Sequence, residues 1–264
     1  MADLRTIAEA IELLAARQRT DGILLADLFA HQAKFCASEK SEAWIFGANR
    51  CGKTEAAALI AAAYARFGIL DPRKVQALVK LGATFDHAPV RIWAISLTNE
   101  LSRNIFQAKL FDNGARIDPR PPLIPASEIA GWNITTQTLK LKNGSIIIFN
   151  SAEGGRDVFQ AQDVDLALFD EVPPKEVYNE GAFRIGGGRR LLIRGAATIL
   201  PPSGMAGGIS WMFPDKVIPW QTRGATPAAC NAASPTIDIF TAGMKDNPTI
   251  LAEEIARLAS VMPS

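Results

Sequence analysis

The sequence predicts an α/β fold in which a mainly parallel β-sheet has helices on both faces, preceded by a short N-terminal helical segment. Three observations support this prediction. Short apolar stretches of strand length alternate with helical patterns, several of these stretches are apolar throughout, and a glycine-rich loop joins the first of them to a helix. Strands that are apolar on both faces are typical of a parallel sheet covered on both sides. In such a sheet, ligands bind at the carboxyl ends of the strands.

The elements follow in order along the chain. Apolar side chains at helical spacing over residues 3–18, ended by Asp21-Gly22, predict an amphipathic packing helix. A strand over residues 43–46 then runs into the glycine-rich loop, and an alanine-rich helix over residues 55–67 follows. Further strands are expected at residues 90–97, in a hairpin at 138–150 with the two-residue turn Asn143-Gly144, at 164–169 and at 191–198. Loops are expected at residues 119–125, 186–188 and 201–208, and a last short helix at 248–259.

Composition indicates a soluble globular protein. Of the 264 residues, 48% are hydrophobic and 21% charged, which suffices for one sizeable core. The net charge of +1 creates no general field for a polyanion, so any nucleic-acid contact must be local. The three cysteines lie far apart without metal-ligand spacing, which favours reduced thiols in a cytosolic compartment. The charged N-terminus and the lack of a long apolar run argue against a secretory signal and a membrane span.

An eight-residue loop carries the most specific motif. Its residues are Gly47, Ala48, Asn49, Arg50, Cys51, Gly52, Lys53 and Thr54, and they match G-x-x-x-x-G-K-[ST] between a predicted strand and a predicted helix. The two glycines let backbone N–H groups wrap the phosphates of ATP, and the following helix points its positive end at them. Lys53 is expected to reach the terminal phosphates and Thr54 to ligate Mg²⁺. The motif predicts a P-loop ATPase, because a plain turn would not need lysine and threonine at the helix start.

Two carboxylates follow the apolar strand at residues 164–169. Asp170 and Glu171 lie at its carboxyl end, the edge of the sheet where the phosphate loop also opens. Asp170 is expected to bind Mg²⁺, and Glu171 to orient and polarise the attacking water. Acidic residues after a strand are by themselves typical of a solvated turn, which Pro173-Pro174 would suit. Together with the phosphate loop, the pair predicts hydrolysis by a P-loop NTPase of the RecA-like, ASCE type.

With these motifs, the chain resembles the ATPase domain of the large terminase subunit, the DNA-packaging motor of tailed bacteriophages. The resemblance extends over most of residues 31–255. The similar segments are the phosphate loop with Gln32, Phe35 and Ser38 ahead of it, residues 155–160 (GRDVFQ), residues 197–201, residues 208–213 and Asp246-Asn247-Pro248.

The resemblance implies roles for further residues. Gln32 is a candidate for reading the adenine, and Thr198 for coupling hydrolysis to motion, although ordinary hydrogen bonding at a strand end explains Thr198 equally well. An arginine from a neighbouring subunit can neutralise charge on the phosphates in the transition state, and Arg156 is the candidate. Arg50, inside the loop, competes for part of this task. A surface salt bridge remains an alternative for either arginine.

The resemblance also implies an organisation and partners. It divides the chain into a helical segment (1–30), a motor domain (31–245) and an edge helix or linker (246–264) toward a nuclease domain that this chain lacks. We therefore expect an excised motor domain, or a protein without cutting activity. The implied partners are double-stranded DNA, the portal protein, the small terminase subunit and further copies of the chain in a ring, by resemblance a pentamer, with a monomer as the alternative in isolation. The implied location is the host cytoplasm during virus assembly.

A basic cluster is the candidate DNA contact. Arg184, Arg189, Arg190 and Arg194 surround the glycine-rich turn and could engage phosphates without reading bases. Pairing with nearby acids, or solvation of an exposed strand edge, is the slightly favoured alternative. The tryptophans at positions 93, 132, 211 and 220 are interpreted as packing anchors rather than base-stacking platforms, and His31 and His87 receive no catalytic role.

Two other functions remain open. A helicase-like or DNA-remodelling ATPase would share the phosphate loop and the acidic pair, but two-domain helicases need a second motor lobe, for which no segment fits here. A nucleotide-gated scaffold would bind ATP only as a ligand, and the presence of Glu171 argues against it.

Overall fold

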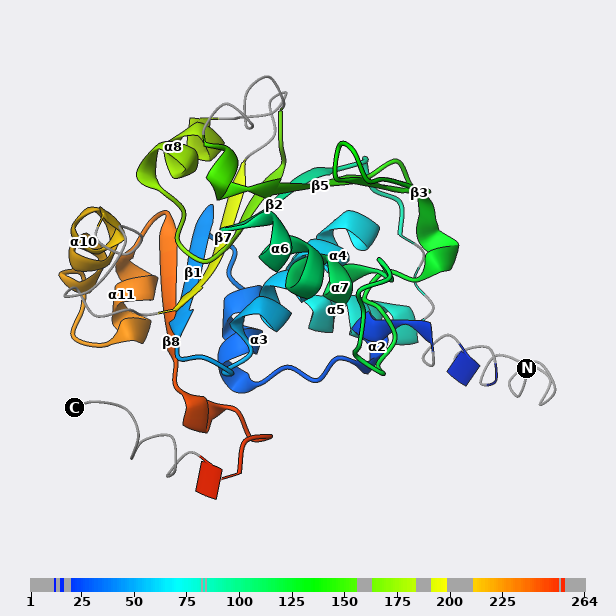
Figure 1. The fold of residues 1–264 in the computed structure, drawn as a ribbon. Helices are drawn as coiled ribbons and strands as arrows, with labels where there is room; N and C mark the ends of the chain where they lie inside the picture. Colours follow the sequence, from blue (N-terminus) through cyan, green and yellow to red (C-terminus); the bar gives the residue numbers. More distant parts are fainter. Residues whose placement is uncertain are drawn as a thin grey trace.

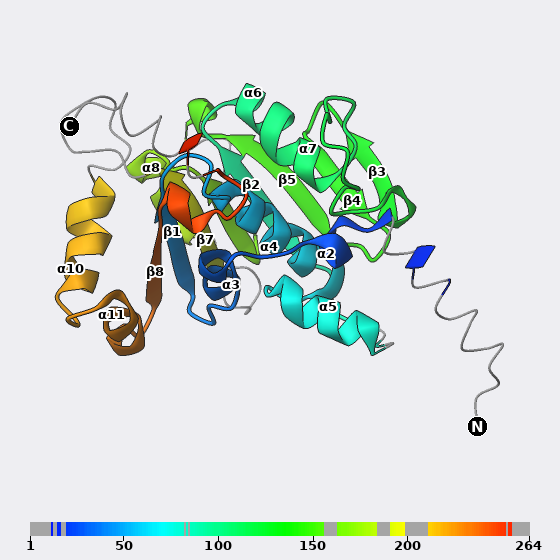
Figure 2. The same ribbon diagram turned by 90° about the horizontal axis from the view of Figure 1, so that it is seen from below.

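The computed structural model describes residues 12, 15–16, 20–81, 83, 85–155, 163–183, 191–198, 211–251 and 253–254. In this part of the chain, an eight-stranded sheet has helices on both faces (Figures 1 and 2), which confirms the predicted α/β class. Residues 12, 15 and 16 of the predicted first helix are described and are helical, whereas the rest of that helix before residue 20 and the loops at 186–188 and 201–208 fall outside the described residues. The last helix was predicted to begin at residue 248, but residues 248–250 form a turn closed by the Ile250 N–H on the Asn247 carbonyl, and the described helical residues are 253–254. The boundaries after residues 30 and 245 stay predictions.

The sheet has the strand order β3-β4-β5-β2-β6-β7-β1-β8. The six strands from β5 to β8 in this order run parallel, whereas β3, β4 and β5 pair antiparallel. The expectation of a mainly parallel sheet is therefore confirmed. The strands are β1 (Glu42–Gly47), β2 (Arg91–Ser96), β3 (Ile129–Asn133), β4 (Thr138–Leu141), β5 (Ile146–Ser151), β6 (Leu166–Asp170), β7 (Leu192–Thr198) and β8 (Ile237–Ala242).

Two hydrophobic cores lie on opposite faces of the sheet. Helix α4 (Lys53–Phe67) supplies much of one core with small, fully buried alanines, which let the helix pack close to the strands. Figure 2 shows α10 and α11 on the other side of β1 and β8 from α3 and α4. The remaining α-helices are α2 (Gly22–Leu25), α3 (Ala30–Cys36), α5 (Pro72–Lys80), α6 (Asn99–Leu101), α7 (Ala108–Leu110), α8 (Lys175–Phe183), α10 (Ile218–Gln221) and α11 (Pro227–Ala233). Among the described residues, no helix is long and apolar enough to cross a membrane.

Strand β1 shows how the sheet and its two cores fit together. Its residues alternate between the faces, with Ala43 and Ile45 in the α4 core and Trp44 in the other. Trp44 stacks on Phe169 with ring centroids 6.0 Å apart, and a Cβ at Gly195 would lie 2.1 Å from the Trp44 ring. Strand β7 can therefore lie next to β1 only because glycine occupies position 195.

The predicted tryptophan anchors pack as expected. Trp93 and Trp220 are buried, and the Trp211 indole donates a hydrogen bond to the Pro173 carbonyl at 2.9 Å. Trp132 packs against Phe111 with centroids 5.0 Å apart. These contacts account for the rings without a base-stacking role.

The hairpin between β4 and β5 is confirmed, but its turn differs from the prediction. Leu141 N bonds to Ser145 O and Gly144 N bonds to Leu141 O, so three residues form the loop instead of two. Gly144 has φ +88°, the left-handed conformation that ends such three-residue loops. The Asn143 amide donates to the Ala65 carbonyl at 2.9 Å, which ties the loop to the end of α4.

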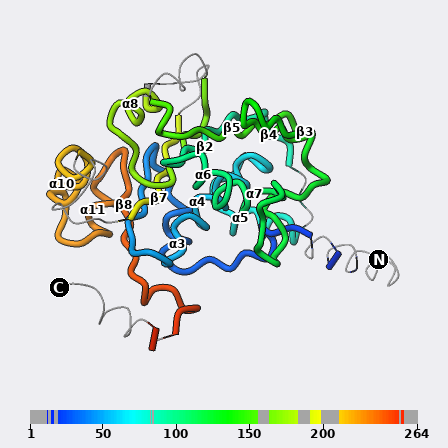
Figure 3. The backbone as a smooth tube through the Cα atoms, in the orientation of Figure 1, coloured from blue at the N-terminus to red at the C-terminus, as the bar shows by residue number. Residues whose placement is uncertain are grey.

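The position of β7 matters most for the site. It lies between β1 and β6, so Thr198 is in register with Gly47 at the start of the phosphate loop, and Ala196 is in register with Asp170. The backbone tube in Figure 3 shows β1, β7 and β8 side by side although they are far apart in the sequence. The carboxyl ends of β1, β7 and β6 therefore meet at one edge. Strands β3 and β8 were not predicted.

Candidate active site

The phosphate loop owes its shape to its backbone. Arg50 and Gly52 have φ values of 64° and 84°, in the left-handed region that favours glycine. A Cβ at Gly52 would lie 2.4 Å from Gln32 Nε2, and a Cβ at Gly47 would lie 2.6 Å from the Ala242 carbonyl oxygen. Glycine is therefore favoured at position 47 because a side chain would meet the backbone, and at position 52 because of the left-handed backbone conformation.

Helix α3 braces the loop from below. Gln32 Nε2 donates to the Gly52 carbonyl at 2.8 Å, and its Oε1 accepts from the Phe29 N–H at 2.8 Å. His31 Nε2 donates to the Cys51 carbonyl at 2.8 Å. Gln32 thus shapes the loop, and its contact with adenine stays a prediction. His31 is a bracing residue that the sequence reasoning missed, because a single histidine on a helix carries no signal of its partner.

Lys53 turns back over the loop. Its side chain is largely buried, and Nζ donates to the Ala48 carbonyl at 3.0 Å. The ammonium group therefore lies at the N-terminal end of α4, where unpaired backbone N–H groups and the helix dipole already favour an anion.

Thr54 and Asp170 meet although 116 positions separate them. Thr54 Oγ1 donates to Asp170 Oδ1 at 2.9 Å. Burial raises the pKa of Asp170 to about 6, helped by the charge of Glu171, whereas the Thr54 hydrogen bond and the charges of Lys53 and Lys109 lower it. Among the described residues, this half-buried carboxylate has only one hydrogen-bond donor, a neutral hydroxyl, on its side chain, and a cation bound there would offset the cost of its burial.

The donor set suits Mg²⁺. A hydroxyl and one carboxylate are hard oxygen ligands, and Mg²⁺ is usually held by one or two carboxylates together with substrate phosphates and water. In the described part of the chain, no cluster of three or more His, Cys, Asp or Glu side chains could hold a metal by itself. The residues present therefore fit an ion that arrives with a nucleotide.

Glu171 is clamped by the neighbouring strand. Thr198 N–H donates to Glu171 Oε2 at 2.6 Å, and Thr198 Oγ1 donates to Glu171 Oε1 at 2.7 Å. Glu171 has φ +83°, a costly conformation for a non-glycine residue that persists only where surrounding contacts impose it. Its own N–H donates to the Ala196 carbonyl at 2.8 Å. Thr198 thus makes hydrogen bonds at the end of its strand, as one alternative expected, and their acceptor is Glu171, the carboxylate proposed to orient water.

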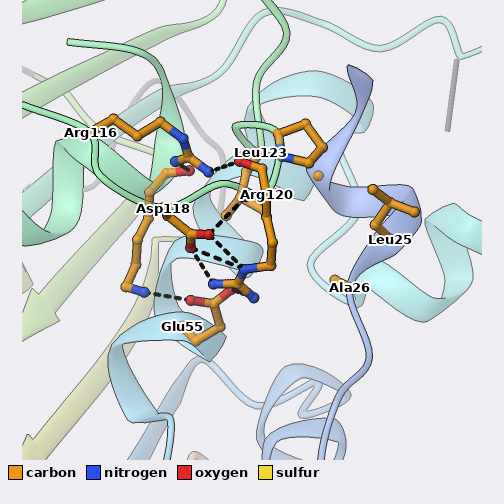
Figure 4. Close-up of a pocket in the computed structure, with 10 residues that line it drawn as sticks. Leu25, Ala26, Glu55, Arg116, Asp118, Arg120 and Leu123 are labelled. Atoms are coloured by element: carbon orange, nitrogen blue, oxygen red, sulfur yellow. Dashed lines mark hydrogen bonds and ion pairs between the residues drawn. The ribbon is translucent and has the colours of Figure 1, made fainter. Parts of the chain in front are cut away.

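A network of charged side chains lies beside the start of helix α4. Glu55 Oε2 is 2.6 Å from Lys109 Nζ, and Glu55 Oε1 is 3.3 Å from Arg120. Arg120 also pairs with Asp118 at 2.6 Å, and its hydrogen bonds hold the pKa of Asp118 down at about 2. Figure 4 shows these groups around a small pocket between α2, α4 and the segment before Leu123. Sequence reasoning missed this network, because its members come from separate segments without a motif.

The structure describes only one of the two arginines that are candidates for neutralising charge on the phosphates. Arg50 is 64% exposed in its side chain and pairs with Glu254 at 2.6 Å, and the Asn247 amide donates to its carbonyl at 2.6 Å. A salt bridge was one of the alternatives for this residue. Arg156 lies outside the described residues.

The proposed basic cluster needs a correction at Arg194. Its side chain is fully buried, and its guanidinium donates to the carbonyls of Ser38, Lys40 and Ile193 at 2.9, 3.1 and 2.7 Å. The prediction of a DNA contact is wrong for this residue, because its position in β7 directs the side chain into the protein. The three other members, Arg184, Arg189 and Arg190, lie outside the described residues.

The fold is similar to solved terminase structures. The large terminase of a thermophilic bacteriophage, in complex with ADP, is 15% identical with a TM-score of 0.56, over 90% of this chain and 51% of that one. The complex of the same terminase with ATP-gamma-S is 13% identical with a TM-score of 0.54, over 90% and 50%. The large terminase ATPase domain of Thermus phage P74-26 is 15% identical with a TM-score of 0.52, over 92% and 91%. The chain thus spans about half the length of the two nucleotide-bound terminase chains, and their likeness concerns the fold alone.

Sequence comparison gives the family. No curated protein matches the chain. The family described as terminase large subunit, T4likevirus-type, N-terminal, matches residues 44–215, which include the phosphate loop, the acidic pair and Thr198. This match covers more than half of the chain and confirms the resemblance stated from the motifs. The chain belongs to the terminase large subunit family, in its T4likevirus-type N-terminal part.

Proposed function

We propose that this chain is the ATP-hydrolysing motor domain of a terminase large subunit that translocates double-stranded DNA into a procapsid. The observation that carries the proposal is a convergence at one edge of the sheet. Asp170 holds the hydroxyl of the phosphate-loop Thr54, and the adjacent Glu171 is held by Thr198 on the strand between them. The large terminase of the thermophilic bacteriophage has been solved with ADP and with ATP-gamma-S, which supports a nucleotide as the ligand of this fold.

The phosphate loop would bind the triphosphate. Backbone N–H groups of residues 48–54 and the Lys53 ammonium would hold phosphate oxygens, with Lys53 exchanging the Ala48 carbonyl for the ligand. Thr54 and Asp170 would hold Mg²⁺, which when bound neutralises charge on the phosphates. Gln32 is proposed on the adenine side of the loop that it braces.

Glu171 would orient and polarise the attacking water. Each of its oxygens accepts one hydrogen bond from Thr198 and keeps lone pairs for a water molecule, so the clamp fixes the carboxylate without blocking it. A shift of β7 would turn this carboxylate. Thr198 is therefore proposed to couple hydrolysis to movement of the strand.

Assembly and DNA contact complete the proposal. Arg156 is proposed to act on the nucleotide of a neighbouring copy, with Arg50 as the alternative, in a homo-oligomeric ring on the portal of the procapsid in the host cytoplasm. Double-stranded DNA and the small terminase subunit are the other proposed partners. Arg184, Arg189 and Arg190 remain candidates for phosphate contacts. The proposal assigns no nuclease chemistry to these residues.

Replacing the proposed water-orienting carboxylate tests the hydrolytic step. Glu171→Gln keeps the shape but loses the basic oxygen, so ATP turnover should fall by roughly 10²- to 10⁴-fold while ATP-gamma-S affinity stays close to that of the unsubstituted protein. Phosphate release and equilibrium binding measure the two quantities. Glu39→Gln, at a highly exposed glutamate, is the matched control. Unchanged turnover in Glu171→Gln would remove the residue from its role.

The clamp is tested separately at Thr198. Thr198→Val keeps the β-branched shape and the backbone N–H bond but loses the hydroxyl bond, and turnover should fall about 10-fold, the scale seen when a supporting hydrogen bond is removed. Thr198→Ser retains the hydroxyl and should recover most of the activity. Equal turnover for the valine and serine variants would contradict the clamp.

A further inference from the structure

Ser96, at the carboxyl end of β2, has a buried hydroxyl group that finds no hydrogen-bond partner among the described residues. The residue is 2% exposed, and no donor or acceptor of the described residues pairs with its Oγ. Such atoms are uncommon in folded proteins, because a buried hydroxyl has given up its hydrogen bonds to water. Ser151, in register with Ser96 on β5, shows the usual situation, since its Oγ donates to the Leu97 carbonyl at 3.1 Å. The described part of the fold therefore does not account for the Ser96 hydroxyl.

The position of Ser96 points to the metal side of the active site. On its other side, Ser96 is in register with Asp170 on β6. Neighbouring strands lie about 4.8 Å apart, and residues in register on parallel strands point to the same face. Ala94 and Leu168, two residues earlier on each strand, both belong to the core under α4. Ser96 and Asp170 therefore point to the face where Thr54 reaches Asp170 from the start of α4.

The chemistry of this corner favours a water molecule as the missing partner. Thr54 occupies Oδ1 of Asp170, so the carboxylate still has acceptor capacity next to the Ser96 hydroxyl. Mg²⁺ bound through one carboxylate and substrate phosphates keeps several water ligands, which need acceptors and donors around them. The Ser96 hydroxyl beside that carboxylate can act as a hydrogen-bond donor or as an acceptor for such a water molecule.

We propose that Ser96 is a positioning residue for the magnesium hydrate, whose hydroxyl hydrogen-bonds a water molecule that Asp170 also holds. This inference rests on the proposed ATPase function. It adds a residue from β2, a strand that carries neither the phosphate loop nor the acidic pair.

Metal binding, measured without turnover, tests the inference. Mn²⁺ replaces Mg²⁺ as the probe, and its electron paramagnetic resonance signal gives its affinity for the complex of the protein with ATP-gamma-S. Ser96→Ala should weaken Mn²⁺ binding roughly 10-fold, the scale for losing a supporting partner of a metal site. Its ATP-gamma-S affinity in EDTA should be unchanged. Its melting temperature without ligand should be equal or higher, because the substitution removes only a hydroxyl that has no partner among the described residues.

Two further variants separate positioning from structure. Ser96→Thr keeps the hydroxyl and should bind Mn²⁺ more tightly than Ser96→Ala. Ser151→Ala loses a satisfied hydrogen bond at the next strand, so its melting temperature should fall while its Mn²⁺ affinity stays unchanged.

Three outcomes would overturn the inference. Equal Mn²⁺ affinity in Ser96→Ala and the unsubstituted protein would show that no metal-bound water depends on this hydroxyl. A lower melting temperature of Ser96→Ala without a change in Mn²⁺ affinity would assign Ser96 to structure alone. If the unsubstituted protein bound ATP-gamma-S without any metal dependence, the proposed ATPase function would fail together with this inference. The first two outcomes, in contrast, would overturn only the role of Ser96.

Discussion

The two ends of helix α4 both place charge inside the protein, but they treat it differently. At the C-terminal end, Arg66 is buried and donates five hydrogen bonds, two to Asp21, two to Glu128 and one to the Leu123 carbonyl. Burial lowers the pKa of Arg66, but the hydrogen bonds with Asp21 and Glu128 outweigh this and raise it above its usual value. All five N–H groups of the guanidinium are thereby used.

At the N-terminal end, the charge is left incompletely balanced. Asp170 is paired with a neutral hydroxyl, Lys53 with a carbonyl, and Ser96 with no group of the described residues. The difference teaches where a ligand is needed. A buried charge with a full set of partners holds the fold together, whereas buried polar groups with an incomplete set mark the place where phosphate, metal and water would complete it.

The largest effect on stability is expected at the C-terminal end. Arg66→Met should lower the free energy of unfolding by about 3–5 kcal/mol, because it leaves the buried Asp21 and the partly buried Glu128 without their counter-charge. Urea denaturation monitored by circular dichroism measures this. A loss below about 1 kcal/mol would mean that the arginine is no more than a surface-type ion pair, and the comparison would break down.

An effect of opposite sign is expected at the N-terminal end. In EDTA and without nucleotide, Asp170→Asn should raise the free energy of unfolding by about 1–2 kcal/mol, because the burial that raises the pKa of Asp170 to about 6 penalises its charged form at pH 7. Asp21→Asn is the matched control at the other end and should destabilise, because Asp21 neutralises Arg66. If both variants changed stability in the same direction, the two ends would not differ as inferred.

The smallest effect is expected in the partly exposed charge network beside the start of α4. Arg120, with its side chain 59% exposed, should contribute less than about 1 kcal/mol, so Arg120→Met should barely change thermal unfolding at pH 7. Because the pKa of Asp118 is lowered from 3.8 to about 2, its pairing with Arg120 stabilises the fold above pH 3.8 and is lost as the pH falls through about 2. The small difference between Arg120→Met and the unsubstituted protein should therefore vanish over this range. A difference that grew toward low pH would have the wrong sign.

Much of the site was predictable because its signals are local. The phosphate loop is a contiguous motif between a strand and a helix, and Asp170-Glu171 follows a strand that is apolar throughout. The apolar stretches also predicted six of the eight strands and the mainly parallel sheet. The hairpin was found, but its turn length depended on the tether from Asn143 to the end of α4, which the local pattern does not contain.

Other features depend on strand order, which no local pattern encodes. Arg194 follows a glycine-rich turn and was therefore predicted to be a cation on the surface. Because β7 lies between two other strands of the sheet, the Arg194 guanidinium is instead buried against carbonyl groups. Likewise, Ser96 carries no motif. Its position next to Asp170 depends on the pairing of β2 with β6.

The amino-acid sequence by itself determined the fold class, the phosphate-loop motif and the position of the two carboxylates at a strand end, because contiguous residues set local backbone shape and side-chain chemistry. Only the tertiary structure decided that Thr198 grips Glu171, that Thr54 meets Asp170 and that Arg194 is buried. These pairings join segments 27 and 116 positions apart in the first two cases. The two hydrogen-bonded pairs form because β7 packs between β1 and β6. The carboxyl ends of these three strands, which are distant in the sequence, therefore lie next to one another.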